Sequence, residues 1–326
     1  MIARYAVPFF LLMAFVIVPL VVFFLCRWLL PRRWGKKVGI AVALLLMLFA
    51  AYGMLVGYEQ MEVHTVEFTS KDLPKAFDGY RIVQFSDAHV GTMTGRRAWL
   101  LQRAVDSILA LHPDMIVFTG DLQNVYPEEL IDHLPQLQRL KAPDGVYAVL
   151  GNHDYAVYQP YDSLTKEANC AKTQALFRQT GWTLLMNEHR IIRRDSDSIV
   201  IAGMENWGVV KRMPRRGDVK KTLSQSHSSF HTPHSTFIIM LQHDPTAWRE
   251  KILPECNAQL TLSGHTHGGQ VSLFGWSPSA LSYQDYEGMV YEGPRALYVS
   301  TGVGALIPFR LSLPGEIVVI TLRAKK

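Results

Sequence analysis

The chain has 326 residues, 48% of them hydrophobic, and a formal net charge of +5 at pH 7. Residues 1–60 hold six Lys or Arg and one acid, and the rest of the chain carries equal numbers of bases and acids. The positive charge therefore belongs to the first segment, and the composition gives no indication of a nucleic-acid-binding surface on the remainder.

Two charge-free apolar runs open the chain, from Tyr5 to Cys26 and from Val38 to Tyr58. At about 1.5 Å per residue, each is long enough to cross a hydrocarbon core about 30 Å thick. A cleaved signal peptide has a shorter apolar region, and here a second run follows the first. We therefore expect residues 1–60 to form a transmembrane hairpin, with helices at about 5–30 and 38–58.

Five bases lie at the turn of this hairpin, in the stretch "RWLLPRRWGKK". Lys and Arg beside membrane helices are retained on the cytoplasmic side. The turn should therefore face the cytoplasm, and both chain ends should lie on the opposite side. Cys170 and Cys256 could pair in an oxidising compartment, but two cysteines do not define a disulfide framework.

From about Val63, short β-type runs alternate with helical ones, which predicts an α/β domain over residues 63–326. Helices are expected at 98–111, from Pro127 and at about 163–180, and a solvated loop at 210–235 that contains His227, His231 and His234. The strands are nearly continuous apolar runs, as in sheets covered on both faces. In chain order the main ones are "RIVQF", "MIVFTG", "VYAVL", "SIVIAG", "STFIIMLQ", "AQLTL", "ALYVS" and "EIVVITL".

Potential metal ligands follow five of these strands. The carboxyl ends of strands form the ligand crevice of open α/β sheets, so these side chains should converge. Carboxylate and amide oxygens mixed with imidazoles suit Mn²⁺, with Fe or Zn²⁺ as alternatives, and seven ligands suit two ions. Any one of these residues alone would be an ordinary core or surface side chain. The seven are Asp87, His89, Asp121, Asn152, His243, His265 and His267.

These motifs resemble those of the calcineurin-like metallophosphoesterases. The family pattern D-x-H, G-D, G-N-H-[DE], H, G-H-x-H is found here as "DAH", "GD", "GNHD", "QHD" and "GHTH", over roughly residues 80–322. The stretch "GHTHGGQ" and the tail "YVSTGVG…PFR…PGEIVVITL" are similar to the bacterial membrane-associated phosphodiesterase branch. The resemblance and the two apolar runs together predict a bacterial inner-membrane, multi-pass protein, and the basic turn predicts that its catalytic domain lies outside the cytoplasm.

The resemblance also implies a four-layer α/β/β/α sandwich after the hairpin, and two divalent metal ions. Asp121 would bridge the two ions, and His153 would face the substrate as general acid or charge stabiliser. Many members carry a carboxylate three residues after the G-D aspartate, where this chain has Asn124. The first ion would take Asp87, His89, Asp121 and His267, and the second Asp121, Asn152, His243 and His265.

The expected activity is that of a membrane-anchored, metal-dependent phosphodiesterase or pyrophosphate hydrolase. Its substrate would be a phosphoester, with a lipid-linked one among the candidates. Arg96 and Arg310 are candidate phosphate contacts, although each could equally be a surface or packing arginine. The alternatives are a UDP-diacylglucosamine-type nucleotide-lipid pyrophosphatase and a non-catalytic scaffold of the same fold. A nuclease is disfavoured by the neutral domain.

Overall fold

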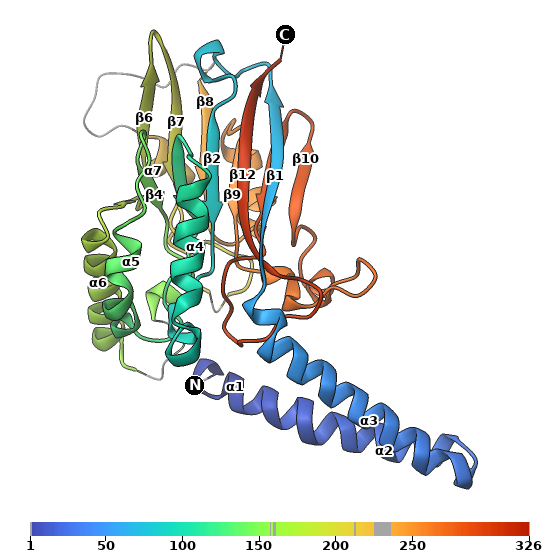
Figure 1. Ribbon diagram of the computed structural model, residues 1–326. Helices are drawn as coiled ribbons and strands as arrows, with labels where there is room; N and C mark the ends of the chain where they lie inside the picture. Colours follow the sequence, from blue (N-terminus) through green and yellow to red (C-terminus); the bar gives the residue numbers. More distant parts are fainter. Residues whose placement is uncertain (1, 157, 159–160, 212, 225–235, 326) are drawn as a thin grey trace.

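The computed structural model describes residues 2–156, 158, 161–211, 213–224 and 236–325. Two apolar helical stretches form a hairpin at its N-terminal end (Figure 1). The first consists of α1 (Ile2–Leu12), a π-helical turn (Met13–Ile17) and α2 (Val18–Leu29), and the second is α3 (Arg32–Leu55). Ala6–Leu29 and Arg32–Glu59 are long and apolar enough to cross a membrane.

Twelve strands in the described residues form two six-stranded sheets. The first sheet has the order β1-β12-β2-β3-β4-β5, and the second has the order β10-β11-β9-β8-β7-β6. Most neighbouring strands are parallel, and the β12–β2, β6–β7 and β10–β11 pairs are antiparallel. The bounds are β1 Met61–Ser70, β2 Arg81–Phe85, β3 Met115–Phe118, β4 Val146–Ala148, β5 Thr183–Leu184, β6 Glu188–Arg194, β7 Asp197–Gly203, β8 Phe237–Leu241, β9 Leu260–Ser263, β10 Gly288–Glu292, β11 Arg295–Val299 and β12 Gly315–Ala324.

One hydrophobic core lies between the two sheets, where Ile82 and Val117 of the first sheet join Ile201 and Ile239 of the second. Helices cover the outer face of the first sheet through α4 (Trp99–Ala110) and α6 (Ser163–Gln179), near the short α5 (Leu134–Leu137). The outer face of the second sheet packs on α7 (Val219–Leu223) and on the π-helical turn Trp248–Ile252, which leads into α8 (Leu253–Glu255). The predicted α/β class with two N-terminal apolar helices is confirmed.

Four strands were not predicted. Polar residues interrupt the apolar run in β1, β6 and β10, and β5 is only two residues long. β1 lies at a sheet edge, and most of its side chains are exposed. The helix expected from Pro127 is a 3₁₀ helix, Pro127–His133. The expected loop at 210–235 contains α7, and His227, His231 and His234 lie outside the described residues. Cys170 and Cys256 are free thiols.

The carboxyl ends of β2, β3, β4, β8 and β9 all point to the same end of the two sheets, on the side of the hairpin (Figure 1). We call this the ligand end, and the edge where these strands begin the opposite end. The loops after the five strands therefore meet at one place. This placement brings together the residues considered next.

Candidate metal centre

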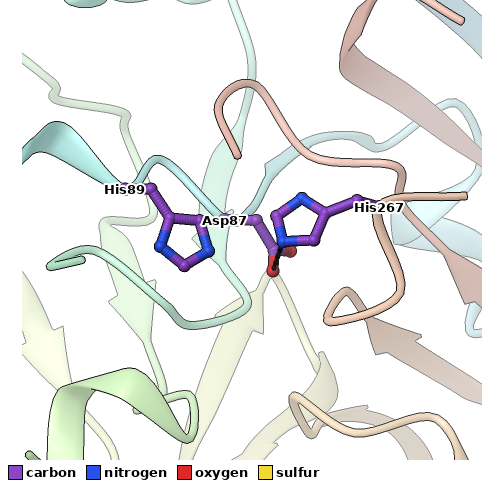
Figure 2. A group of neighbouring side chains, drawn as sticks. All are labelled: Asp87, His89 and His267. Atoms are coloured by element: carbon purple, nitrogen blue, oxygen red, sulfur yellow. Dashed lines mark ion pairs between the residues drawn. The ribbon is translucent and has the colours of Figure 1, made fainter. Parts of the chain in front are cut away.

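The loop after β2 and the loop after β9 bring Asp87, His89 and His267 together (Figure 2). His267 Nε2 lies 3.5 Å from Asp87 Oδ1, and the rings of His89 and His267 have centroids 5.1 Å apart. Asp87 and His89 are buried, and His267 is nearly so. The three side chains offer one carboxylate and two imidazoles to a shared point.

A second group forms around the side chain of His243, which follows β8. Its Nε2 lies 3.2 Å from Asp121 Oδ2, 3.1 Å from Asn152 Oδ1 and 3.2 Å from His265 Nδ1. Its Nδ1 donates to the carbonyl oxygen of Thr119 at 2.7 Å. That bond fixes the ring, so Nε2 is the atom that points into the group.

Asp121 connects the two groups. Its Oδ2 lies 3.2 Å from His243 Nε2 and 3.7 Å from Nε2 of His89, which also belongs to the first group. The candidate ligand atoms in each of the sets Asp87–His89–His267 and Asp121–His243–His265 lie within 4.8 Å of one another. The structure thus brings all seven predicted ligand residues together, with one carboxylate between the two sets.

The backbone is unusual at five of these seven residues, because it adopts the left-handed conformation. The φ angle is 52° at Asp87, 43° at His89, 60° at Asp121, 77° at His265 and 52° at His267. A positive φ is uncommon and unfavourable for residues with a Cβ. Strained backbone at a cluster of polar side chains is typical of functional sites, where the surrounding fold imposes the geometry.

The polar atoms of the cluster fit a pair of cations. Three buried ring nitrogens have no hydrogen-bond partner within the described residues. They are Nδ1 and Nε2 of His89 and Nδ1 of His267. Buried polar atoms are normally satisfied, and a neutral imidazole carries one lone pair and one N–H, so His89 has a buried lone pair that a cation could take up. Nitrogen and oxygen donors in this mixture suit Mn²⁺, Fe or Zn²⁺. The clustered residues fit a dimetal site.

The charges of the cluster support the same conclusion. Burial lowers the pKa of His89 to about 3, so this ring is neutral and keeps a lone pair. Burial alone would lower the pKa of His243, but the charge of Asp121 and the hydrogen bond to it raise it to about 10. Without a metal ion, His243 Nε2 therefore carries a proton that faces Asp121 Oδ2 and Asn152 Oδ1. A bound cation would take the place of that proton.

His153 lies beside the seven residues, and the main chain holds it there. Its backbone N–H donates to Asp121 Oδ1 at 2.8 Å. Its Nδ1 lies 2.6 Å from the carbonyl oxygen of Asn124, which can only accept, so Nδ1–H is the donor. The main-chain carbonyl of Asn124 makes this bond, and the side-chain amide of that residue does not. The ring lines a cavity of about 230 Å³ at the ligand end.

The structure does not bring the two predicted phosphate-binding arginines to this cavity. Arg310 is fully buried, and its guanidinium donates to the carbonyl oxygens of Thr301, Gly302 and Gly304 at 2.7–2.9 Å. Arg96 is exposed and pairs with Glu59 at 3.1 Å. Arg310 therefore ties loops together and does not face the cavity. The sequence motif that singled it out carries no signal of its burial.

Two positioning residues were not predicted. The Asp154 carboxylate accepts from the backbone N–H groups of Gly151 and Asp121 at 2.9 and 2.8 Å and of Leu122 and Gln123 at 3.1 and 3.2 Å, and so joins two of the ligand loops. Tyr283 lies with its hydroxyl 2.9 Å from His265 Nε2. Asp154 could have been found as the last residue of "GNHD", whereas no local pattern marks Tyr283.

Comparisons with known proteins agree with this geometry. The family model of the calcineurin-like phosphoesterases matches residues 80–269. The chain is 32% identical over 283 residues to the uncharacterized metallophosphoesterase YkuE of Bacillus subtilis, over 84% of this chain and 90% of that protein. It is 31% identical over 286 residues to an uncharacterized metallophosphoesterase of Aquifex aeolicus, over 86% of this chain and 98% of that protein. A transmembrane protein with metallophosphoesterase domain from Danio rerio is 31% identical over 282 residues, over 84% of this chain and 60% of that protein. The chain belongs to the calcineurin-like phosphoesterase family.

Proposed function

We propose that this protein is a membrane-anchored, dimetal phosphoric ester hydrolase that acts on phosphodiesters or pyrophosphates, built as a four-layer α/β/β/α sandwich. The observation that carries the proposal is the position of Asp121 between two sets of ligand atoms. Asp87, His89, Asp121 and His267 would hold one ion, and Asp121, Asn152, His243 and His265 the other. Mn²⁺ is the ion that we expect first, because oxygen and imidazole ligands are combined.

Two bound divalent ions would polarise the phosphoryl group and lower the pKa of a water molecule. The residues of this chain orient the reactants. The Nδ2 group of Asn152 donates to Tyr158 Oη at 2.6 Å, so its Oδ1 is the atom turned toward His243. The Nδ1–H bond of His153 to Asn124 leaves the second ring nitrogen for the substrate. We assign His153 the role of protonating the departing oxygen.

Hydrolysis by the purified, full-length protein tests this proposal. The substrates are bis-p-nitrophenyl phosphate, p-nitrophenyl phosphate, cyclic nucleotides and nucleotide lipids, each with added Mn²⁺, Fe²⁺ or Zn²⁺. We expect metal-dependent hydrolysis of phosphodiesters above that of the monoester. A metal-loaded protein that hydrolyses none of them would favour the non-catalytic scaffold, which the complete ligand set argues against.

We infer that the two apolar helices span the membrane, with their basic turn in the cytoplasm and the hydrolase domain outside it. The five bases near the turn, including Arg32, Arg33 and Lys36, support this orientation. Alkaline phosphatase fused after Lys326 should be active, and green fluorescent protein fused there should be dark. The reverse pair of results would place the domain in the cytoplasm and would restore the nucleotide-lipid pyrophosphatase, which the present orientation disfavours.

A further inference from the structure

The ligand end of the domain is docked on the membrane hairpin (Figure 1). The backbone N–H of Arg310 donates to the carbonyl oxygen of Gly53 at 3.0 Å. Side chains from the region around α4 bind the same end of α3, since Arg97 Nη2 donates to the carbonyl of Met54 at 2.8 Å and Arg103 Nη1 to that of Glu59 at 3.1 Å. The candidate metal centre and the membrane surface are therefore on the same side of the domain.

Phe309 extends from the domain and packs against the two apolar helices. Its ring centroid lies 4.8 Å from that of Phe10, and its ring packs so closely on Gly53 that a side chain at position 53 would overlap with it. Phe10 and Gly53 both belong to the stretches that are long enough to cross a membrane. The segment around Phe309 must therefore reach the boundary between headgroups and hydrocarbon.

A second apolar segment lies beside it, Leu273–Trp276, which we call the apolar tip. The backbone joins the two segments, because Ser272 N–H donates to the Leu311 carbonyl at 3.0 Å. Phe274 is fully exposed, and Leu273 and Trp276 are about half exposed. Adjacent exposed apolar side chains mark a contact surface, and aromatic residues are enriched at the level of the headgroups.

One cavity joins the candidate metal centre to apolar residues close to Phe309 in the sequence. Its lining includes His153, His265 and His267 together with Leu306 and Ile307. Leu306 and Ile307 belong to the run "ALIPF" that ends at Phe309. A small hydrophilic ester would leave this apolar wall unused, whereas an acyl or isoprenoid chain would cover it.

We propose that the substrate is a membrane amphiphile whose phosphoester reaches His153 while its apolar chain passes Leu306 and Ile307 into the bilayer. This inference rests on the proposed hydrolase function. In the reaction, the oxygen of water bonds to phosphorus and the phosphorus–oxygen bond to the leaving group breaks. The leaving oxygen takes a proton, and the apolar product stays in the bilayer.

The test compares two esters that share a leaving group. The full-length protein is reconstituted into phosphatidylcholine vesicles with Mn²⁺. It is given methyl p-nitrophenyl phosphate in solution, or a dioleoylglycerol phosphodiester with a p-nitrophenyl headgroup in the bilayer. We expect both to be hydrolysed. Hydrolysis of the soluble ester alone would overturn the amphiphile and leave the hydrolase intact, whereas hydrolysis of neither would overturn both.

Variants separate the apolar wall from the chemistry. Leu306→Ser should lower kcat/KM for the lipid ester about tenfold more than for the soluble ester, because an apolar contact of leucine size is lost. Phe274→Ser should lower only the lipid reaction. Tyr291→Ser is the matched control, since Tyr291 is an exposed aromatic residue at the opposite end, paired with Ala296, and should change neither. Equal losses on both esters would overturn the proposal.

Fluorescence gives a measurement that does not depend on turnover. Brominated phosphatidylcholine quenches tryptophans that lie at the bilayer, and we expect Trp276→Tyr to remove part of the quenching seen with the parent protein. Unchanged quenching would mean that the apolar tip lies in water. That result would overturn the contact between the ligand end and the membrane.

Discussion

Both ends of the sheets carry polar side chains, but the two ends differ in whether these side chains are paired by hydrogen bonds. At the opposite end, Arg194 Nη2 binds Asp114 Oδ1 at 2.6 Å and Asp144 Oδ2 at 3.3 Å, and Tyr80 donates to Asp144 at 2.7 Å. The guanidinium of Arg194 also lies over the ring of Tyr80, 4.4 Å from its centroid. At the ligand end, by contrast, the buried ring nitrogens of His89 have no hydrogen-bond partner among the described residues.

This difference separates stability from function within one fold. A network in which carboxylates and a guanidinium bind one another stabilises the domain and has less capacity to bind a ligand. Unpaired lone pairs and a left-handed backbone at Asp87 and Asp121 cost stability. Such a cost is expected where side chains are positioned to bind a ligand. If stability and function are separated in this way, substitutions at the two ends should have different effects.

The largest effect should come from Asp121→Asn, which removes the charge that both sets of ligands share. Metal-ion catalysis contributes several kcal/mol, so we expect kcat/KM to fall by about three powers of ten or more. The melting temperature of the metal-free protein should fall moderately, because in that state the Asp121 carboxylate pairs with the protonated His243 and accepts from the backbone N–H of His153. A metal-free variant that melts far below the parent would mean that Asp121 is mainly a structural residue.

The next effect concerns His153→Ala, which should keep the bound metal and lose general acid catalysis. Such catalysis contributes about 10²–10⁴-fold and matters most for poor leaving groups. We therefore expect a larger loss of rate on an alkyl phosphodiester than on bis-p-nitrophenyl phosphate. Equal losses on the two substrates would assign His153 to charge stabilisation, and loss of metal would make it a ligand.

At the opposite end, Asp114→Asn is the counterpart of Asp121→Asn. The Asp114 carboxylate accepts from Arg194 and from the backbone N–H of Arg81 at 2.7 Å. Weakening this partly exposed pair should lower the free energy of unfolding by about 1 kcal/mol. Hydrolysis should be unchanged. A loss of activity at unchanged stability would contradict the division between the two ends.

The smallest effect should be a pH dependence at His64, which lies on β1 with Nδ1 3.0 Å from the buried Glu316. The hydrogen bond to Glu316 raises the pKa of His64 from 6.5 to about 9. Because the folded pKa is the higher one, the stabilisation is complete below pH 6.5 and is lost as the pH rises through 9. His64→Gln should therefore lower the melting temperature at pH 6 and leave it nearly unchanged at pH 10.

Much of the site could be predicted from the sequence, because each ligand follows a strand whose apolar residues form a continuous run. "RIVQF" before Asp87 and "AQLTL" before His265 are such cases, and parallel strands bring their carboxyl ends together. β1 was not predicted, because at a sheet edge most of its side chains are exposed and polar residues interrupt the pattern.

The rest depends on contacts between distant segments, which no local pattern contains. Glycines suggest where the chain turns tightly, yet the left-handed conformation falls on Asp87, Asp121 and His267 themselves. Arg310 follows an apolar pair and looks available to a ligand, but the loops around Thr301 bury it. Tyr283 reaches His265 from a separate loop.

The most direct test of the account is the metal content of the purified, full-length protein after loading with Mn²⁺ and removal of excess ion. Elemental analysis should find two ions per chain in the parent. His243→Ala should retain the ion held by Asp87, His89 and His267, and Asp121→Asn should lose the most metal. One ion or none in the parent protein would contradict the dimetal centre.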